Sequence, residues 1–590
     1  MSLESIDQLL ARADAWRQGD PDPDAAAELA ALLDKVRAKD AKAEAELRDR
    51  FSGALEFGTA GLRGVIGAGE TRMNRAVVRR ATEGLARYLV ANVPDVRARG
   101  VVVGRDGRKM SVEFADDTAG ILAAHGIPAL FFVDVAPTPV TAFATLHLKA
   151  AAAVMVTASH NPPEYNGYKV YWANGAQIIP PHDTGIAAEI AKVGPARDIK
   201  VLTPGEARSN GLWRDLDTSV ARAYHAAIAK EQRHPEIQAR DFSIVYTAMH
   251  GVGGVWARDA LAAAGFSNVH LVAEQFEPDG AFPTVRFPNP EEPGALDLSL
   301  ALADKTQAEL ILANDPDADR LACVTRRKDG TMKPLTGNEV GVLLGHYVLT
   351  QTTPRPQFPS VMTTIVSSPQ LGVIAHELGA LYDELLTGFK WIGNRAIERE
   401  QKDHATFLMG YEEALGYTVG DVARDKDGIG SALVFADLVA WVRSRGLTVH
   451  EYLEEIQRAH GLFVAMQKNH TFPGAAGAET ITKIMDGFRK APPTTIGDFK
   501  VKTVKDYQTG AGLGAAKLPT SNVIAYELEG GSRVTLRPSG TEPKIKYYFD
   551  LRESFAANET LAVARARADM RLDALMAAFA KLAVERGQPS

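Results

Sequence analysis

Four stretches of the sequence carry side chains suited to a phosphorylated ligand. The first, ASHNPPEYNGYK, sets Ser159 beside His160 and reaches Lys169 ten residues later, with Asn166-Gly167 as a turn signal. It follows AAAVMV, an apolar run typical of a strand buried on both faces, and such strands present their carboxyl-end loops at ligand crevices. A serine nucleophile with nearby cations suits phosphoester chemistry. A Ser-centred turn or helix cap is the alternative, and no G-x-S-x-G elbow supports an esterase.

The second stretch, ANDPDADRLACV, places Asp315, Asp317 and Asp319 at alternating positions between two strand candidates. Three carboxylates this close repel one another unless a cation lies among them, although a solvated acidic loop is the alternative. An EF-hand is excluded, because its Gly position holds Arg320 and its bidentate Glu position holds Arg326. Mg²⁺, which keeps open positions for phosphate oxygens, fits best and indicates phosphoryl transfer.

The other two stretches fit the two ends of a sugar phosphate. GYEEALGY sets Glu412 and Glu413 after a strand candidate, where carboxylates can accept hydrogen bonds from sugar hydroxyls; a solvated helix start is the alternative. RVTLRPSGTEPKIKYY gathers a set suited to clamp phosphate, with a basic β-turn as the alternative: Arg537, Ser539, Gly540, Thr541 and Lys546. No Walker A motif occurs, so a nucleoside triphosphate is not implied. Together the four stretches specify a phosphosugar.

Composition limits the classes of protein that this chain can be. The net charge of −7 is spread over 590 residues without charge runs, which argues against nucleic-acid and anionic-membrane partners. The single cysteine, Cys323, lies in an apolar run and predicts a core thiol, and a disulfide framework is excluded. The sequence has no stretch of 18 apolar residues and no signal-peptide pattern. We therefore expect a cytoplasmic protein.

The elements that must position these stretches alternate between strands and helices. Residues 4 to 49 predict two polar helices broken by GDPDPD, an appended arm. Three α/β units follow, with parallel strands joined by crossover helices. Helices are expected near 111–124, 138–147, 295–306 and 449–459. The tail is α+β, with a helix near 478–490. The predicted division is an arm at 1–49, three α/β domains at 50–210, 211–330 and 331–458, and a fourth domain at 459–590.

Beyond about residue 50, the chain resembles the α-D-phosphohexomutase superfamily, the phosphoglucomutases and phosphomannomutases. TASHNPPEYNGYK looks like that family's phosphoserine loop, DPDADR its metal loop, GYEEALGY its sugar loop and RPSGTEPK its phosphate loop. EFGTAGLRG resembles the N-terminal signature and adds Arg63 to the site, and TGFKWIGN resembles a third-domain loop that adds Lys390. The resemblance implies three similar α/β domains and a C-terminal α+β domain around a central active-site cleft.

The resemblance also implies a mechanism. Ser159 would carry a phosphoryl group, with Mg²⁺ on the three aspartates and on Ser159. Lys169 would move the proton, with Arg63, His160 and Arg320 close by and Lys390 also in the catalytic set. The sugar phosphate would bind Glu412, Glu413, Arg537, Ser539, Gly540 and Thr541, and glucose 1,6-bisphosphate would be both intermediate and activator. The partner would be a small sugar phosphate, and the protein a monomer or a homodimer.

One departure from the family pattern bears on the substrate. Ala414 follows the two glutamates, where glucose-specific and mannose-using members commonly have a Ser. In this respect the chain looks more like the branch that includes phosphopentomutases and glucose-bisphosphate synthases. Interconversion of glucose 1-phosphate and glucose 6-phosphate is the first expectation, with phosphomannomutase and phosphopentomutase activities as alternatives. A metal-dependent sugar phosphatase and a silent sugar-phosphate-binding regulator remain as further classes.

Overall fold

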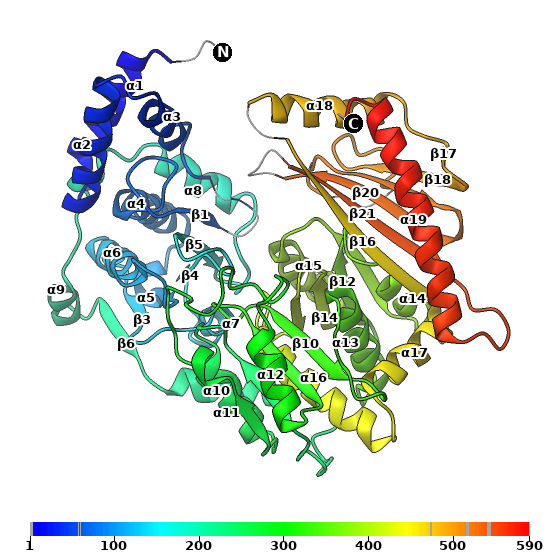
Figure 1. Ribbon diagram of the computed structural model, residues 1–590. Helices are drawn as coiled ribbons and strands as arrows, with labels where there is room; N and C mark the ends of the chain where they lie inside the picture. Colours follow the sequence, from blue (N-terminus) through cyan, green and yellow to red (C-terminus); the bar gives the residue numbers. More distant parts are fainter. Residues whose placement is uncertain are drawn as a thin grey trace.

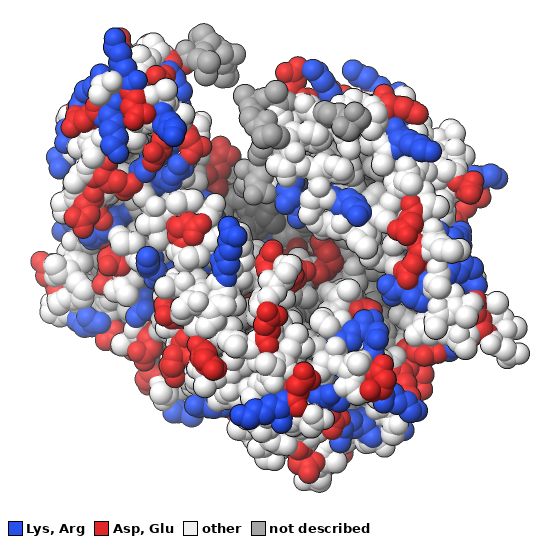
Figure 2. Space-filling view, viewed as in Figure 1, with Lys and Arg blue, Asp and Glu red and all other residues white. Residues whose placement is uncertain are grey.

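The computed structural model describes residues 4–56, 58, 61–472, 475–514, 518–539 and 544–588, with only the backbone of 475 and 476. Four β-sheets with their helices follow one another around the molecule in chain order (Figure 1). The N-terminal arm and the first sheet stand opposite the C-terminal sheet, and the surface between them is hollowed, with acidic side chains at its floor (Figure 2). The architecture confirms three α/β domains and a fourth of a different type around a central cleft.

The N-terminal arm has three helices, so the prediction of two was wrong. They are α1 (Ile6–Gly19), α2 (Pro23–Arg37) and α3 (Ala41–Arg50). The chain turns at Lys39, whose φ is +66°, and the Asp40 carboxylate accepts hydrogen bonds from the backbone N–H groups of Lys42 and Ala43, which starts α3. The helices share a small core that includes Leu9, Leu33, Leu47 and Phe51.

The first sheet has six strands in the order β1-β5-β4-β2-β3-β6. Strands β2 (Val101–Arg105), β3 (Ala129–Phe132), β4 (Ala152–Val156) and β6 (Trp213–Leu216) are parallel, as expected, whereas β5 (Tyr165–Trp172) and β1 (Leu62–Val65) form an antiparallel edge. Its helices are α4 (Arg75–Asn92), α5 (Val96–Arg99), α6 (Ser111–Ala124), α7 (Thr138–His147), α8 (His182–Ile190) and α9 (Pro204–Ser209). The helices predicted near 111–124 and 138–147 are confirmed. Each residue of β4 is buried, as predicted for a strand covered on both faces.

The second and third sheets share one hydrophobic core with part of the first. The second has the order β11-β10-β9-β7-β8, built from β7 (Ile244–Thr247), β8 (Val269–Leu271), β9 (Leu310–Asn314), β10 (Leu321–Arg326) and β11 (Met332–Pro334). The third has the order β13-β12-β14-β15, built from β12 (Pro359–Thr364), β13 (Leu381–Leu385), β14 (Thr406–Glu412) and β15 (Gly416–Val419). Both are parallel sheets with antiparallel edge strands.

The helices of these two sheets are α10 (Ser219–Ala229), α11 (Gly254–Ala263), α12 (Asp297–Thr306), α13 (Gly337–Gln351), α14 (Gln370–Glu377), α15 (Phe389–Asp403), α16 (Gly428–Ser444) and α17 (Val449–His460). Those predicted near 295–306 and 449–459 are confirmed. Helix α16 is buried along most of its length, because it packs against elements of both sheets. It ties the second and third domains together.

The C-terminal sheet is fully antiparallel and has its own core. Its order is β16-β21-β20-β19-β18-β17, from β16 (Leu462–Thr471), β17 (Thr495–Ile496), β18 (Phe499–Asp506), β19 (Ile524–Leu528), β20 (Arg533–Pro538) and β21 (Lys544–Glu553). Helices α18 (Ala475–Lys490) and α19 (Leu561–Glu585) pack on one face of it (Figure 1). The opposite face contacts the third domain, and this is the face that reaches the site.

Candidate active site

Ser159 lies in the loop after β4, at the carboxyl end of the strand. Its φ is +53°, and its N–H donates to Thr157 Oγ1 at 2.9 Å, so the loop turns sharply. The hydroxyl is buried and donates to Asp315 Oδ2 at 2.9 Å, and it lies 3.1 Å from His160 Nδ1. A residue other than Gly in this backbone conformation is strained, and such strain is concentrated at functional sites. The first and second stretches therefore meet at Ser159.

Arg108 holds this loop in place, and the sequence analysis missed it. Its guanidinium donates to four backbone carbonyls: Ser159 and Asn161 at 2.5 Å each, Pro162 at 2.8 Å and Tyr165 at 3.2 Å. The Arg108 side chain is fully buried and lies 3.3 Å from Asp106. The planar fork of an arginine can satisfy several acceptors at once in a way that a lysine cannot. The signal in the sequence was its place in GRDGRK, at the end of the buried strand β2.

The turn expected at Asn166-Gly167 is not there, because both residues lie within β5. Asn166 is buried and donates to the Lys109 carbonyl and to Ser111 Oγ. A Cβ at Gly167 would lie 2.5 Å from the Thr157 carbonyl oxygen and 2.6 Å from that of Leu62. The Asn-Gly pair therefore serves close strand packing beside the Ser159 loop, not a hairpin turn.

The three aspartates converge after β9 as predicted. One carboxylate oxygen of each lies within 4.8 Å of the others, and all three side chains are buried. Among the described residues, Oδ1 of Asp317 and Oδ1 of Asp319 are buried without a hydrogen-bond partner. Buried orphan oxygens in a set of three carboxylates are the donor chemistry of a hard divalent cation. The residues present therefore fit a metal ion.

Lys169 and Thr138 complete the surroundings of the aspartates. Lys169 Nζ lies 2.8 Å from Asp317 Oδ2 and 2.8 Å from Asp319 Oδ2, and Thr138 Oγ1 donates to Asp317 Oδ2 at 2.6 Å. Burial alone lowers the pKa of Lys169, but the carboxylates of Asp317 and Asp319 outweigh it and raise the pKa above its ordinary value. Lys169 is therefore held as an ammonium.

The three carboxyl groups have different pKa values despite their proximity. Burial and the charges of Asp317 and Asp319 raise the pKa of Asp315 well above its usual range. Burial also opposes ionisation of Asp319, but Lys169, Lys426 and Arg320 outweigh it and lower its pKa. The pKa of Asp317 is lowered in the same way, chiefly by Lys169. Like charges at short range push pKa values apart in this way, and a bound cation would favour ionisation of all three.

His160 contacts the Ser159 hydroxyl, and Arg63 and Arg320 lie close to His160. Arg63 Nη1 donates to Asn161 Oδ1 at 3.3 Å, and Arg320 Nη1 lies 3.8 Å from Glu291 Oε2. In the described part of the chain, the Nε atoms of both arginines are buried without a hydrogen-bond partner. Burial, reinforced by Arg320 and Arg63, lowers the pKa of His160 well below its ordinary value, so its imidazole is neutral. Unpaired buried guanidinium donors favour an anionic group at this point.

Glu412 and Glu413 lie at the end of β14 and in the turn before β15. Glu412 Oε1 accepts the Gly388 N–H at 2.8 Å, and burial raises the Glu412 pKa. The turn after Glu413 also touches the segment after the three aspartates, since the Leu321 N–H donates to the Leu415 carbonyl at 3.0 Å. The acid pair is therefore held at a strand end beside the loop of the aspartates, and is not the start of a solvated helix.

Two lysines contact the site from the third domain. Lys390, at the start of α15, donates to the Gly58 carbonyl at 3.3 Å, which brings it to the segment before Arg63. Lys426 Nζ lies 3.2 Å from Asp319 Oδ2, and the sequence analysis missed it. The sequence feature that could have indicated Lys426 is the charged run RDKD, which stands directly before the apolar helix α16. A charged side chain next to a buried helix needs a partner of opposite charge.

The fourth stretch is described in part. Arg537 lies on β20 and pairs across the sheet with Lys546 on β21. Burial, together with Arg537, lowers the pKa of Lys546. Ser539 is described, with its N–H donating to the Lys544 carbonyl at 2.7 Å, whereas Gly540 and Thr541 lie outside the described residues. The described part of the stretch thus gathers cations on one face of the C-terminal sheet.

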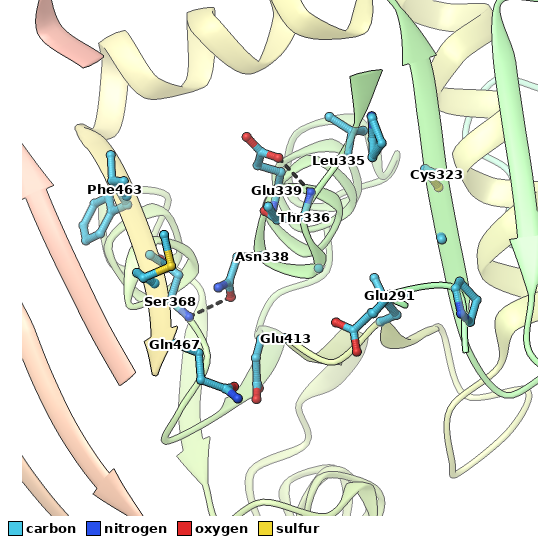
Figure 3. Close-up of a pocket in the computed structure, with 18 of the residues that line it drawn as sticks. Glu291, Cys323, Leu335, Thr336, Asn338, Glu339, Ser368, Glu413, Phe463 and Gln467 are labelled. Atoms are coloured by element: carbon cyan, nitrogen blue, oxygen red, sulfur yellow. Dashed lines mark hydrogen bonds between the residues drawn. The ribbon is translucent and has the colours of Figure 1, made fainter. Parts of the chain in front are cut away.

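A cavity of about 560 Å³ lies next to Glu413, between the second, third and fourth domains. Glu413 and Gln467 lie side by side at its wall, and Glu291 points toward them from the opposite side (Figure 3). Its volume suits a small polar ligand. Neither Ser159 nor the three aspartates line it.

Comparison with known proteins identifies the family. Models of the four domains of phosphoglucomutase/phosphomannomutase match in chain order: α/β/α domain I at residues 54–197, domain II at 222–330, domain III at 336–459 and the C-terminal domain at 498–568. The chain belongs to this family. It is a member of the α-D-phosphohexomutase superfamily and an enzyme of the intramolecular phosphotransferase class.

Curated relatives in this family carry different substrate names. A probable phosphomannomutase of Haemophilus influenzae is 43% identical over 81% of this chain and 93% of its own length. The human phosphopentomutase is 38% identical over 86% of both chains. A phosphoglucomutase of Staphylococcus saprophyticus is 34% identical over 86% of this chain and 92% of its own length. In the part of the chain that is described, no helix combines the length and apolarity needed for a membrane span.

Proposed function

We propose that this protein interconverts glucose 1-phosphate and glucose 6-phosphate, with a phosphoryl group carried on Ser159 and glucose 1,6-bisphosphate as the intermediate. The observation that carries the proposal is the buried Ser159 hydroxyl, which donates to one of three metal-type carboxylates in a site where the buried Nε atoms of Arg63 and Arg320 have no hydrogen-bond partner. Phosphoryl transfer depends on positioning and on charge stabilisation, and both are built around this one oxygen.

Asp315, Asp317 and Asp319 would hold Mg²⁺ together with the group on Ser159. The ion would neutralise charge on the transferring phosphoryl oxygens. Arg63 and Arg320 would donate to that phosphoryl group through the atoms that lack partners here. Lys169 is protonated beside Asp317 and Asp319, so it can accept a proton from a sugar hydroxyl only once those carboxylates are otherwise neutralised.

The sugar would bind between the third domain and the C-terminal domain. Glu412 and Glu413 would accept hydrogen bonds from its hydroxyls, and the stretch from Arg537 to Thr541 would hold the phosphate that is not being transferred. After the first transfer, the bisphosphate must turn over so that its other phosphate faces Ser159. One clamp and one acid pair must therefore accept both orientations.

A pentose 1-phosphate is the second candidate substrate. Ala414 supplies no hydroxyl beside the acid pair, and a site that lacks one hydrogen-bonding partner cannot strongly reject a sugar that lacks the matching hydroxyl. The resemblance of this sequence to a phosphopentomutase supports the same candidate. We expect both sugars to be turned over, with glucose preferred.

Three measurements test the proposal. Peptide mass spectrometry should find phosphate on Ser159, and phosphate only on another residue, with full activity in Ser159→Ala, would refute the assignment. A comparison of kcat/KM for glucose, mannose and ribose 1-phosphates, with the sugar bisphosphate supplied, should place glucose first. A hundredfold preference for ribose 1-phosphate, equivalent to about 2.7 kcal/mol at the transition state, would overturn the choice of glucose. Release of inorganic phosphate equal to product would identify a phosphatase instead.

A further inference from the structure

The hydroxyls of Ser367 and Thr364 contact the Glu413 carboxylate. Ser367 Oγ donates to Glu413 Oε2 at 3.0 Å, and Thr364 Oγ1 lies 3.3 Å from the same oxygen. Ser367 Oγ also accepts the backbone N–H of Glu413 at 3.2 Å, and the two hydroxyls lie 2.8 Å apart. Both residues are fully buried, Thr364 at the end of β12 and Ser367 in the loop after it. The orientation of Glu413 is therefore set by Ser367.

The same Ser367 also contacts the C-terminal domain. Its carbonyl accepts a hydrogen bond from Arg533 Nη2, and Arg533 Nη1 pairs with Glu384 of β13. Asp550 of β21 lies 3.5 Å from Arg533 Nη2. Arg533 is 4% exposed, so these contacts are made away from water, where the loss of one partner is costly. One residue of the third domain thus touches both the sugar-binding carboxylate and the C-terminal sheet.

Arg533 and Arg537 lie on one strand, β20. They are four residues apart, so the alternation of a strand puts them on the same face, separated by about 13 Å at roughly 3.3 Å per residue. Each is also paired across the sheet, Arg533 with Asp550 and Arg537 with Lys546. Strand β20 is paired with β21 along its whole length and with β19 from Arg533 to Leu536, so it is a rigid element. The contacts from Glu413 through Ser367 to Arg533 therefore reach the strand that carries Arg537.

We propose that Arg533 is a positioning residue that fixes the phosphate clamp at Arg537 relative to the sugar-binding carboxylate of Glu413. It touches neither sugar nor phosphate. It sets the spacing between the two groups that recognise the two ends of the substrate, and so determines which sugar phosphate spans them. This role rests on the proposed function, since it takes Glu413 as the hydroxyl acceptor and Arg537 as the phosphate ligand.

The test is a double-mutant cycle between Arg533→Lys and Glu413→Gln, read as the Kd of glucose 1-phosphate by calorimetry. Arg533→Lys keeps the charge but loses the fork, and we expect about a tenfold weaker Kd. In the Glu413→Gln background, Arg533→Lys should weaken binding no more than twofold. The reason is that Arg533 acts on binding by positioning Glu413 relative to Arg537, and the contact of Glu413 with the sugar is already lost in that background. If the Kd of the double variant is weakened by the product of the two single fold-changes, the proposal is overturned. Independent effects would indicate that Arg533 only forms a structural ion pair.

A matched control comes from the same domain. Arg552 of β21 also contacts a segment outside the C-terminal sheet, with Nη2 3.5 Å from the carbonyl of His460 at the end of α17, and no contact between Arg552 and Ser367 is found among the described residues. Arg552→Lys should leave the Kd within twofold. If Arg533→Lys fails to fold, as judged by circular dichroism, Glu384→Gln takes its place in the cycle, because it removes the charged partner of Arg533 Nη1 without touching Glu413. Additivity with Glu384→Gln would equally refute the role.

A second readout concerns the length of the substrate. If Arg533 sets the spacing, Arg533→Lys should reduce the ratio of kcat/KM for glucose 1-phosphate over ribose 1-phosphate at least threefold, whereas Arg552→Lys should not. An unchanged ratio would contradict the spacing role. The calorimetric cycle needs no turnover, so absence of mutase activity in the parent would refute the proposed function, while additive Kd values would refute the role of Arg533 alone.

Discussion

Substitution of Arg108 by lysine should disable the enzyme without unfolding it. The Arg108 guanidinium donates to four carbonyls of the Ser159 loop, while a lysine ammonium is a single point with three donors and can reach about two of them. Two lost bonds from a charged donor, at about 1.5–3 kcal/mol each, remove about 3–6 kcal/mol from the loop conformation. The positive charge beside Asp106 is kept, so an unpaired buried charge is avoided.

The expected consequence is a fall in kcat of about a hundredfold, because a displacement of about 1 Å at the nucleophile has an effect of that size. KM for the sugar phosphate should change less than threefold, since Arg108 contacts none of the residues proposed to bind the sugar. The assay is steady-state kinetics with glucose 1-phosphate, together with the phosphorylated fraction of Ser159 by intact-protein mass spectrometry.

The control is Arg105→Lys. Arg105 ends the same strand, β2, but donates to one carbonyl, that of Val133 at 3.1 Å, outside the Ser159 loop. This variant should retain kcat within twofold. The reasoning is refuted if Arg108→Lys keeps kcat within threefold of the parent with an unchanged melting temperature, because the loop would then hold Ser159 in place without the guanidinium.

Three further predictions follow from the site and its surroundings. Thorough chelation, or Asp317→Asn, should lower kcat at least a hundredfold, and Mg²⁺ should restore the chelated parent but not the variant; activity unaffected by both treatments would rule out this loop as the metal site. Arg537→Ala should raise KM about 10- to 100-fold with little change in kcat, as expected for loss of a charged contact to the phosphate that is not transferred; an unchanged KM with loss of the folded circular dichroism signal would make Arg537 structural. Burial raises the pKa of Asp427 to about 6, so the folded protein retains this proton to a higher pH than the unfolded chain, and stability falls as pH rises between about 4 and 6. Asp427→Asn cannot ionise and keeps an oxygen for the Ile429 and Gly430 N–H groups. The melting temperature of this variant minus that of the parent should therefore increase from pH 4.5 to pH 7. A constant difference would show that Asp427 is not buried as a neutral acid.

The sequence determined the local elements and the candidate residues of the site. Helices α6, α7, α12 and α17 were predicted near their observed ranges, because their apolar periodicity and turn residues are local properties. The buried strand β4 was equally legible from AAAVMV. Ser159 and the three aspartates were found because a hydroxyl or closely spaced carboxylates between apolar runs are chemically conspicuous. Cys323 was correctly predicted as a core thiol, and burial raises its pKa.

Local pattern misled where a long-range contact decided the structure. Asn166-Gly167 has the composition of a turn, but Gly167 is required because a Cβ there would lie 2.5 Å from the Thr157 carbonyl oxygen. The arm was given two helices because the stop at Lys39 depends on a left-handed residue that is not Gly, which a sequence pattern does not mark.

Only the tertiary structure revealed the residues that hold the site together. Arg108, Thr138, Lys426 and Arg533 act through contacts with segments 51, 179, 107 and 166 residues away. Each is an ordinary polar residue at its own position, and its partner is chosen by the packing of whole domains. The sequence could name the groups that we propose to carry out the chemistry, because their spacing is local. It could not name the groups that orient them, because a buried charge is defined by the partners that folding brings to it.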